Sequence, residues 1–202
     1  MSAIPPPPNF LVWSSHERTR SRVEQCGALG EVESALRRAY DRTKDREKGR
    51  LKPSAVVENE LHNEGWKKTK PSAAPGLLPK DSFDGLKRFS EADLIVAIEI
   101  EWPWQRVTGD LLKFWRAQRY EQIDVGIEVL YGPEAFSYVV NHVYAMYMEL
   151  LRDLRVVFCA LDATDLRGLK FPLTSGINMR VPGLTYVSAE QNHASGLEPP
   201  QE

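Results

Sequence analysis

Two glutamates at the end of an apolar stretch have the residue type and spacing to do chemistry. They are Glu99 and Glu101, in the segment LIVAIEIEW that spans 94–102. Because side chains alternate across a β-strand, the two carboxylates share one face and lie about 6.6–7 Å apart along the backbone. Burial and mutual repulsion raise the pKa of such a pair unless a cation compensates. Since Mg²⁺ takes oxygen ligands of this kind, the pair predicts either a metal site or a strand end that emerges into water.

A third carboxylate is available from the segment that precedes this strand. Asp93 has the same face parity as Glu99, but six extended residues would place the two about 20 Å apart. The segment FDGLKRF at 83–89 predicts a short strand followed by a turn, and that arrangement can bring Asp84 alongside Glu99. The expected set of acids is therefore Asp84, fourteen intervening residues and the Glu99-x-Glu101 pair.

The segments around these acids predict a mixed sheet flanked by helices. Apolar residues at helical spacing predict helices, with a break near Gly27 and Gly30, over 15–41, 54–64, 109–120 and 134–152. Short apolar or alternating runs predict strands over 83–89, 94–102, 123–132 and 156–163. This order of elements indicates one α/β or α+β domain.

The same patterns assign several side chains to the interior or the surface. Thr108 is the expected N-cap of the 109–120 helix, which should bury Leu112 and expose Lys113. Glu128 faces away from the apolar side of its strand, so we expect it to be solvated or paired with a cation.

Four neighbouring motifs resemble those of the BglII/BstYI-type restriction endonucleases, which are members of the PD-(D/E)XK nuclease superfamily. They are the charged connector TKDREKGRLKP before a helix that ends in EGWKK, the aspartate on a strand before VAIEIEW, the segment GDLLKF, and the strand IDVGIEVL. Together these motifs cover about residues 40–131. The resemblance implies an α/β fold with a restriction-endonuclease-like mixed β-sheet flanked by helices.

The resemblance also implies roles for the acids. Asp84 and Glu99 would ligate Mg²⁺, and Glu101 would take the place usually held by lysine. As a base, Glu101 could accept a proton from the attacking water or hold that water on the metal. A further carboxylate or amide would come from the preceding helix, for which the candidates are Glu58, Asn59 and Glu60.

We expect basic residues outside this group of acids to contact double-stranded DNA. Charged runs such as 16–52 more often mark solvated helix faces than nucleic-acid contacts. The residues expected to contact DNA are Lys67, Lys68, Lys113 and Arg116.

The function that follows is an Mg²⁺-dependent type II restriction endonuclease, a hydrolase that cuts double-stranded DNA at a short palindrome as a homodimer. One alternative is a catalytically inactive protein that keeps the nuclease fold and binds DNA or another partner. A monomeric nicking or repair enzyme is a further alternative within the nuclease class.

Composition sets the outer limits of these expectations. Hydrophobic content of 42%, charged content of 27% and a net charge of −2 describe an ordinary globular chain without a general attraction to polyanions. We see no signal peptide and no apolar run of about 20 residues, which favours a cytoplasmic protein without a membrane partner. We expect a flexible arm at 1–14, the endonuclease domain at 15–188 and a disordered tail at 189–202.

Overall fold

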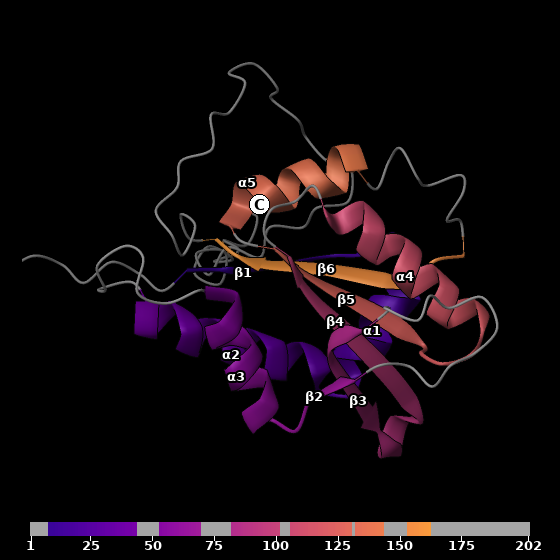
Figure 1. The fold of residues 1–202 in the computed structure, drawn as a ribbon. Helices are drawn as coiled ribbons and strands as arrows, with labels where there is room; N and C mark the ends of the chain where they lie inside the picture. The colour runs from indigo at the N-terminus through magenta and orange to yellow at the C-terminus, as the bar shows by residue number, and fades with distance from the viewer. Residues whose placement is uncertain are drawn as a thin grey trace, which may run out of the picture.

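A mixed six-stranded β-sheet runs through the middle of the molecule, with helices on both of its faces (Figure 1). The computed structural model describes residues 8–43, 53–69, 82–101, 106–130, 132–143 and 153–162. The strands are β1 (Phe10–Trp13), β2 (Lys67–Thr69), β3 (Phe83–Phe89), β4 (Leu94–Glu101), β5 (Val125–Leu130) and β6 (Val156–Leu161). The helices are α1 (Glu17–Gln25), α2 (Ala28–Thr43), α3 (Pro53–Asn63), α4 (Val107–Arg119) and α5 (Gly132–Tyr138), which continues into a π-helical turn (Val139–Val143).

The strand order is β1-β6-β5-β4-β3-β2, so β4, β5 and β6 occupy the centre. These three strands are parallel to one another, whereas β1, β3 and β2 pair antiparallel toward the two edges. Helices α1 to α3 cover one face and helices α4 and α5 cover the other (Figure 1). A central strand covered on both faces is apolar along nearly its whole length, which accounts for the runs LIVAI and VVFCAL. The expected α/β class with a mixed sheet is confirmed.

The register of the sheet places three acids in one row. Gly85 of β3 lies opposite Ile98 of β4, so Asp84 falls opposite Glu99 when the antiparallel register continues by one residue. On the other side, Glu99 lies opposite Glu128 of β5. Residues that lie opposite one another share a face, and this face is the one that α4 covers.

Helix α4 lies close to the sheet because Gly126 of β5 has no side chain. A Cβ atom at Gly126 would lie 2.6 Å from Cγ of Phe114, a contact that folded proteins do not tolerate. The Phe114 ring is fully buried and stacks on Phe83, with ring centroids 5.7 Å apart and planes 6° apart. Through this contact, the part of α4 that carries Asp110 and Lys113 lies against the row of acids.

The predicted helices are present, but several begin or end at other residues. The break expected near Gly27 and Gly30 within 15–41 is confirmed, because Gly27, whose φ is +86°, separates α1 from α2. Helix α4 begins at Val107 with Arg106 at the N-cap position, so the expectation that Thr108 caps it is wrong. Of the helix expected at 134–152, residues 134–143 lie in α5 and the π-helical turn. Residues 144–152 lie outside the described residues. Among the described helices, none has the length and apolar character needed to cross a bilayer.

Part of the N-terminal arm expected at 1–14 forms a β-strand. Strand β1 pairs antiparallel with β6 over four residues, from Phe10 opposite Leu161 to Trp13 opposite Phe158. A four-residue edge strand is too short to show a reliable period in sequence, and the same holds for the three-residue strand β2. The tail expected at 189–202 lies outside the described residues.

Three side chains differ from their expected exposure. Glu128 is fully buried, because helices cover both faces of β5, so the expectation of a solvated or paired carboxylate is wrong. Leu112 is 38% exposed, whereas the side chain of Lys113 is only 16% exposed. Helix α4 is therefore rotated so that Lys113, and not Leu112, faces the sheet.

We expect Gly126→Ala to lower the free energy of unfolding by about 1–3 kcal/mol, because the added methyl group overpacks the buried Phe114 ring. A matched control is Gly30→Ala on α2, where a Cβ meets nothing within 4 Å and should be neutral or stabilise by roughly 0.5–1 kcal/mol. Urea unfolding followed by tryptophan fluorescence measures both. Equal destabilisation by the two substitutions would contradict the close approach of α4 to β5.

Candidate functional site

Three carboxylates converge at the end of β4, and we call them the acidic cluster. They belong to Glu99 and Glu101 of β4 and to Asp110 of α4, and each offers an oxygen within 4.8 Å of the other two. The two glutamates share a face, as the alternation of a strand predicts. Asp110 comes from the first turns of the helix that follows the strand. Carboxylate oxygens at this spacing could be ligands of a single divalent cation.

Lys113 lies against the acidic cluster and compensates part of its charge. Its Nζ donates a hydrogen bond to Oε1 of Glu99 at 2.5 Å and lies 2.9 Å from Oδ1 of Asp110. A third hydrogen bond, of 3.1 Å, goes to the main-chain carbonyl of Ser82. Asp110 and Lys113 are three residues apart on α4, so they share one side of the helix. The ammonium group is therefore held in place by groups from three segments of the chain.

Burial shifts the protonation equilibria of the cluster. It raises the pKa of Glu99 to about 9, although the charge of Lys113 acts in the opposite direction. Burial and the nearby charge of Asp110 raise the pKa of Glu101 to about 7. Burial alone would lower the pKa of Lys113, but attraction to Glu99 and Asp110 outweighs it and raises that pKa above its usual range. The cluster therefore carries more acids than one lysine neutralises.

Three buried carboxylate oxygens in and beside the cluster lack hydrogen-bond partners among the described residues. Both oxygens of Glu128 and Oδ2 of Asp110 have no partner among the described residues. Burial, reinforced by the charges of Asp110 and Glu99, raises the pKa of Glu128 well above its ordinary value. Unpartnered buried acceptors are costly, so they mark a place where a cation would be stabilised. The all-oxygen set of donors is the one that Mg²⁺ prefers, and the residues present therefore fit this ion.

Asp84 lies beside the acidic cluster but is not one of its three members. Its Oδ2 accepts a hydrogen bond of 3.1 Å from the main-chain N–H of Ile100, and its Oδ1 lies 3.4 Å from Nζ of Lys68. The strand-turn-strand arrangement expected from the sequence is thus present and brings Asp84 alongside Glu99. The tightest group of carboxylates, however, contains Asp110 in place of Asp84.

The sequence analysis predicts no role for Asp110. Its segment GDLLKF resembles a helix of the restriction endonucleases, but Lys113 is the residue of that segment with a predicted function. A usable signal was present, because Asp110 and Lys113 stand at the i and i+3 positions of a predicted helix directly after the acidic strand.

The three candidates from the preceding helix have different surroundings. Glu60 is only 2% exposed and accepts a hydrogen bond of 2.7 Å from Nε of Arg38, so it joins α3 to α2. Asn59 is exposed. Glu58 lies 3.4 Å from Nζ of Lys68, the same ammonium group that approaches Asp84. Of the three, Glu58 is therefore the one connected to the acids of the site.

The four residues expected to contact DNA are not equally placed to do so. Lys67 and Lys68 are exposed on the edge strand β2, and Arg116 is half-buried on α4. Lys113 points into the acidic cluster and not toward the surface. DNA contact by these residues stays a prediction.

Comparison with known proteins identifies no relative: no family model matches the chain, and neither a curated protein nor a solved structure matches it.

In the absence of divalent metal, we expect the free energy of unfolding to rise as the pH falls from about 9 to about 5. The folded pKa values of Glu99 and Glu101, about 9 and about 7, exceed the ordinary value of 4.5. In this window the folded protein therefore holds protons that the unfolded chain has released, and acidification favours folding. Urea unfolding in EDTA at several pH values measures the effect.

Glu101→Gln removes one of the groups whose pKa burial raises, so the dependence of stability on pH should become weaker between about pH 5 and 7, where Glu99 still contributes, and should change little well above pH 7. Glu33→Gln is the matched control, because Glu33 pairs with Arg37 on the surface of α2 and should leave the profile unchanged. A stability that falls on acidification through this window, with the same slope in Glu101→Gln, would contradict the burial of charge at the cluster.

Proposed function

We propose that the protein is an Mg²⁺-dependent endonuclease that hydrolyses phosphodiester bonds of double-stranded DNA. The observation that carries this proposal is the acidic cluster of Glu99, Glu101 and Asp110, packed against Lys113 at the end of a rigid central strand. Asp84 in the neighbouring strand and the unpartnered Glu128 add further carboxylates to the same face. The resemblance of the surrounding motifs to restriction endonucleases supplies the substrate class.

The residues that would hold Mg²⁺ are Glu99 and Asp110, with Asp84 next to them, while Glu101, the third carboxylate of the cluster, would stay beside the ion without ligating it. Bound Mg²⁺ would supply positive charge for the phosphate group and increase the acidity of water. Without such a cation the buried acids hold protons, as the raised pKa values of Glu99 and Glu101 indicate, and the ion would take the place of those protons.

Glu101 is the proposed general base. It is half-buried, and its pKa of about 7 lies near the pH at which an enzyme works. A base with such a pKa is ionised often enough to accept a proton and basic enough to hold it. The expectation from the resemblance, that Glu101 stands where lysine is usual, agrees with this role.

Lys113 is the proposed source of the positive charge that Glu101 cannot provide. Its ammonium group reaches the same acids from α4 and is fixed by Glu99, Asp110 and the carbonyl of Ser82. A cation that is already oriented stabilises negative charge developing on phosphate oxygens without the cost of reorganisation. The missing lysine of the strand would thus be replaced by one from the following helix.

Recognition of DNA is proposed to involve the edge strand next to Asp84, where Lys67 and Lys68 are exposed. Lysine contacts to phosphates would position the duplex, while base recognition requires other residues. Cleavage of both strands at a short palindrome would require a homodimer, because a two-fold axis presents equivalent sites to the two strands.

One observation favours a second candidate function. Lys113 already occupies oxygens of Glu99 and Asp110 that a metal ion would use. A cluster neutralised by its own lysine could be a purely structural ion-pair network. In that case the chain would be a catalytically inactive protein that keeps a nuclease-like core and binds DNA or another partner.

Mg²⁺ or Mn²⁺ should raise the melting temperature of the wild-type protein, because a cation that binds only the folded state stabilises that state. At a cation concentration one hundred times the Kd, the free energy of unfolding rises by about 2.7 kcal/mol. Asp110→Asn should abolish this shift, whereas Glu33→Gln should retain it. Differential scanning fluorimetry across a metal titration measures the effect. A wild-type melting temperature that does not respond to either ion would refute the metal site.

Supercoiled plasmid should be cut at discrete sites in the presence of Mg²⁺, and Glu99→Ala should abolish the cutting while the protein remains folded. Lys113→Met should also lose cleavage, but it should keep the stabilisation by metal, since the ammonium group is not a ligand. Agarose electrophoresis of plasmids with varied sequences measures cleavage. Plasmids that stay intact although metal stabilises the protein would support the inactive alternative.

A further inference from the structure

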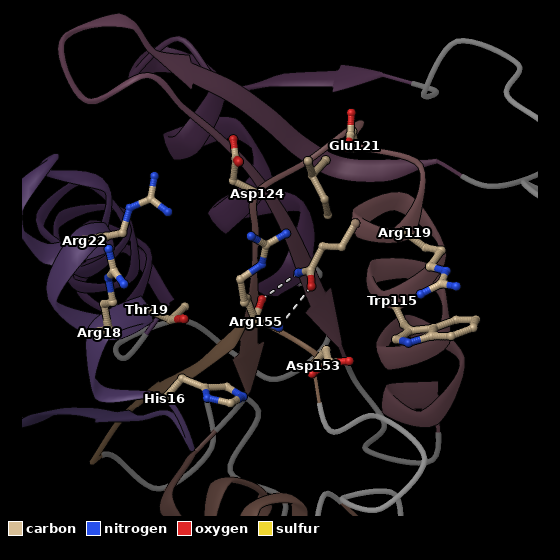
Figure 2. A pocket seen from close by; sticks show the side chains of 12 residues that line it. His16, Arg18, Thr19, Arg22, Trp115, Arg119, Glu121, Asp124, Asp153 and Arg155 are labelled. Atoms are coloured by element: carbon tan, nitrogen blue, oxygen red, sulfur yellow. Dashed lines mark hydrogen bonds between the residues drawn. The ribbon is translucent and has the colours of Figure 1, made fainter.

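A second site lies at the end of the central strands that is opposite to the acidic cluster. It is an open cleft of about 960 Å³ between α1 and α4, at the end where the parallel strands β5 and β6 begin (Figure 2). Strand β4 has eight residues, and at about 3.3 Å per residue its two ends lie roughly 25 Å apart. A single small ligand therefore cannot occupy both sites.

Four arginines line this cleft from three segments of the chain. Figure 2 shows Arg18 and Arg22 on α1, Arg119 on α4, and Arg155 between the two helices. Within the described part of the chain, none of these four guanidinium groups takes part in an ion pair or a hydrogen bond. Arg22 and Arg155 are nevertheless half-buried. Half-buried cations without partners are unfavourable, so they point to an anionic ligand.

The carboxylates around the cleft do not neutralise these arginines. Oδ2 of Asp124 accepts a hydrogen bond of 2.8 Å from the main-chain N–H of Ile95 and so serves the fold. Glu121 and Asp153 are exposed, and Figure 2 shows Glu121 at the top of the group of side chains and Asp153 toward its lower end. Among the described residues no ion pair joins these three carboxylates to the four arginines, and the arginines outnumber them in the cleft.

Arg155 is held in the cleft by its main chain. Its N–H donates to Oε1 of Gln118 at 2.9 Å, and its carbonyl accepts from Nε2 of the same residue at 2.7 Å. Gln118 is only 8% exposed, so this pair of hydrogen bonds is protected from water. The side chain of Arg155 is not needed for it and is available to a ligand.

We propose that this cleft binds a polyphosphate ligand of nucleotide size. The planar guanidinium group matches phosphate oxygens with paired hydrogen bonds, and several such groups at one place favour adjacent phosphates. The volume is within the range of roughly 300–1,000 Å³ that is usual for small-molecule sites. Trp115 of α4 lines the same cleft and offers an aromatic face for a base, which favours a nucleotide over inorganic polyphosphate. This site is independent of the proposed nuclease activity.

Isothermal titration calorimetry of the full chain in EDTA tests the proposal with ATP, tripolyphosphate and adenosine, because EDTA removes any metal from the acidic cluster. ATP and tripolyphosphate should bind and adenosine should not. Tighter binding of ATP identifies a nucleotide, whereas equal binding identifies inorganic polyphosphate as the source of the phosphates. Binding of adenosine as tight as that of ATP, or no binding of either phosphate compound, would overturn the proposal.

Arg155→Ala should weaken ATP binding by about tenfold or more, because it removes charge-assisted hydrogen bonds. Its unfolding midpoint should stay near that of the wild type, since the bonds to Gln118 are made by the main chain. Arg20→Ala is the matched control, because Arg20 lies on α1 but does not line the cleft. Unchanged ATP affinity in both Arg155→Ala and Arg22→Ala would refute the arginine site.

Discussion

The compensation of buried negative charge by Lys113 is the interaction on which the candidate site depends. A row of acids across three strands, Asp84, Glu99 and Glu128, is unfavourable on a covered face of a sheet unless cations or protons offset it. Lys113 reaches this row only because α4 lies close to β5, and α4 lies close only because Gly126 leaves room for Phe114. The packing of one aromatic ring on one glycine thus sets the position of the charge that the acids require.

Local patterns in the sequence were sufficient for part of this arrangement. The two-residue period of a strand placed Glu99 and Glu101 on the same face, and a short strand with a turn brought Asp84 alongside Glu99. Both inferences depend on residues close together in the chain, where backbone geometry alone determines which side chains are neighbours. The α/β class followed in the same way from the alternation of strand and helix segments.

The rest of the site depends on contacts between segments far apart in the chain. Periodicity shows that Asp110 and Lys113 share one side of a helix, but the rotation of α4 over the sheet decides whether that side faces water or Glu99. The burial of Glu128 likewise follows from the central place of β5, which is set by pairing with β4 and β6. Strand β1 gains its structure only from pairing with β6, since four residues alone do not specify a strand.

The net charge of −2 conceals two regions of opposite character. Carboxylates gather where β4 ends, and arginines that form no ion pair with any described residue gather where β5 and β6 begin. The separation of roughly 25 Å exceeds the Debye length of about 8 Å at physiological ionic strength, so the two regions hardly neutralise each other. A phosphate-bearing ligand is attracted to the arginine cleft directly. At the acidic end one ammonium group faces three carboxylates, so the proposed chemistry on phosphates would require a divalent ion to offset the remaining acids.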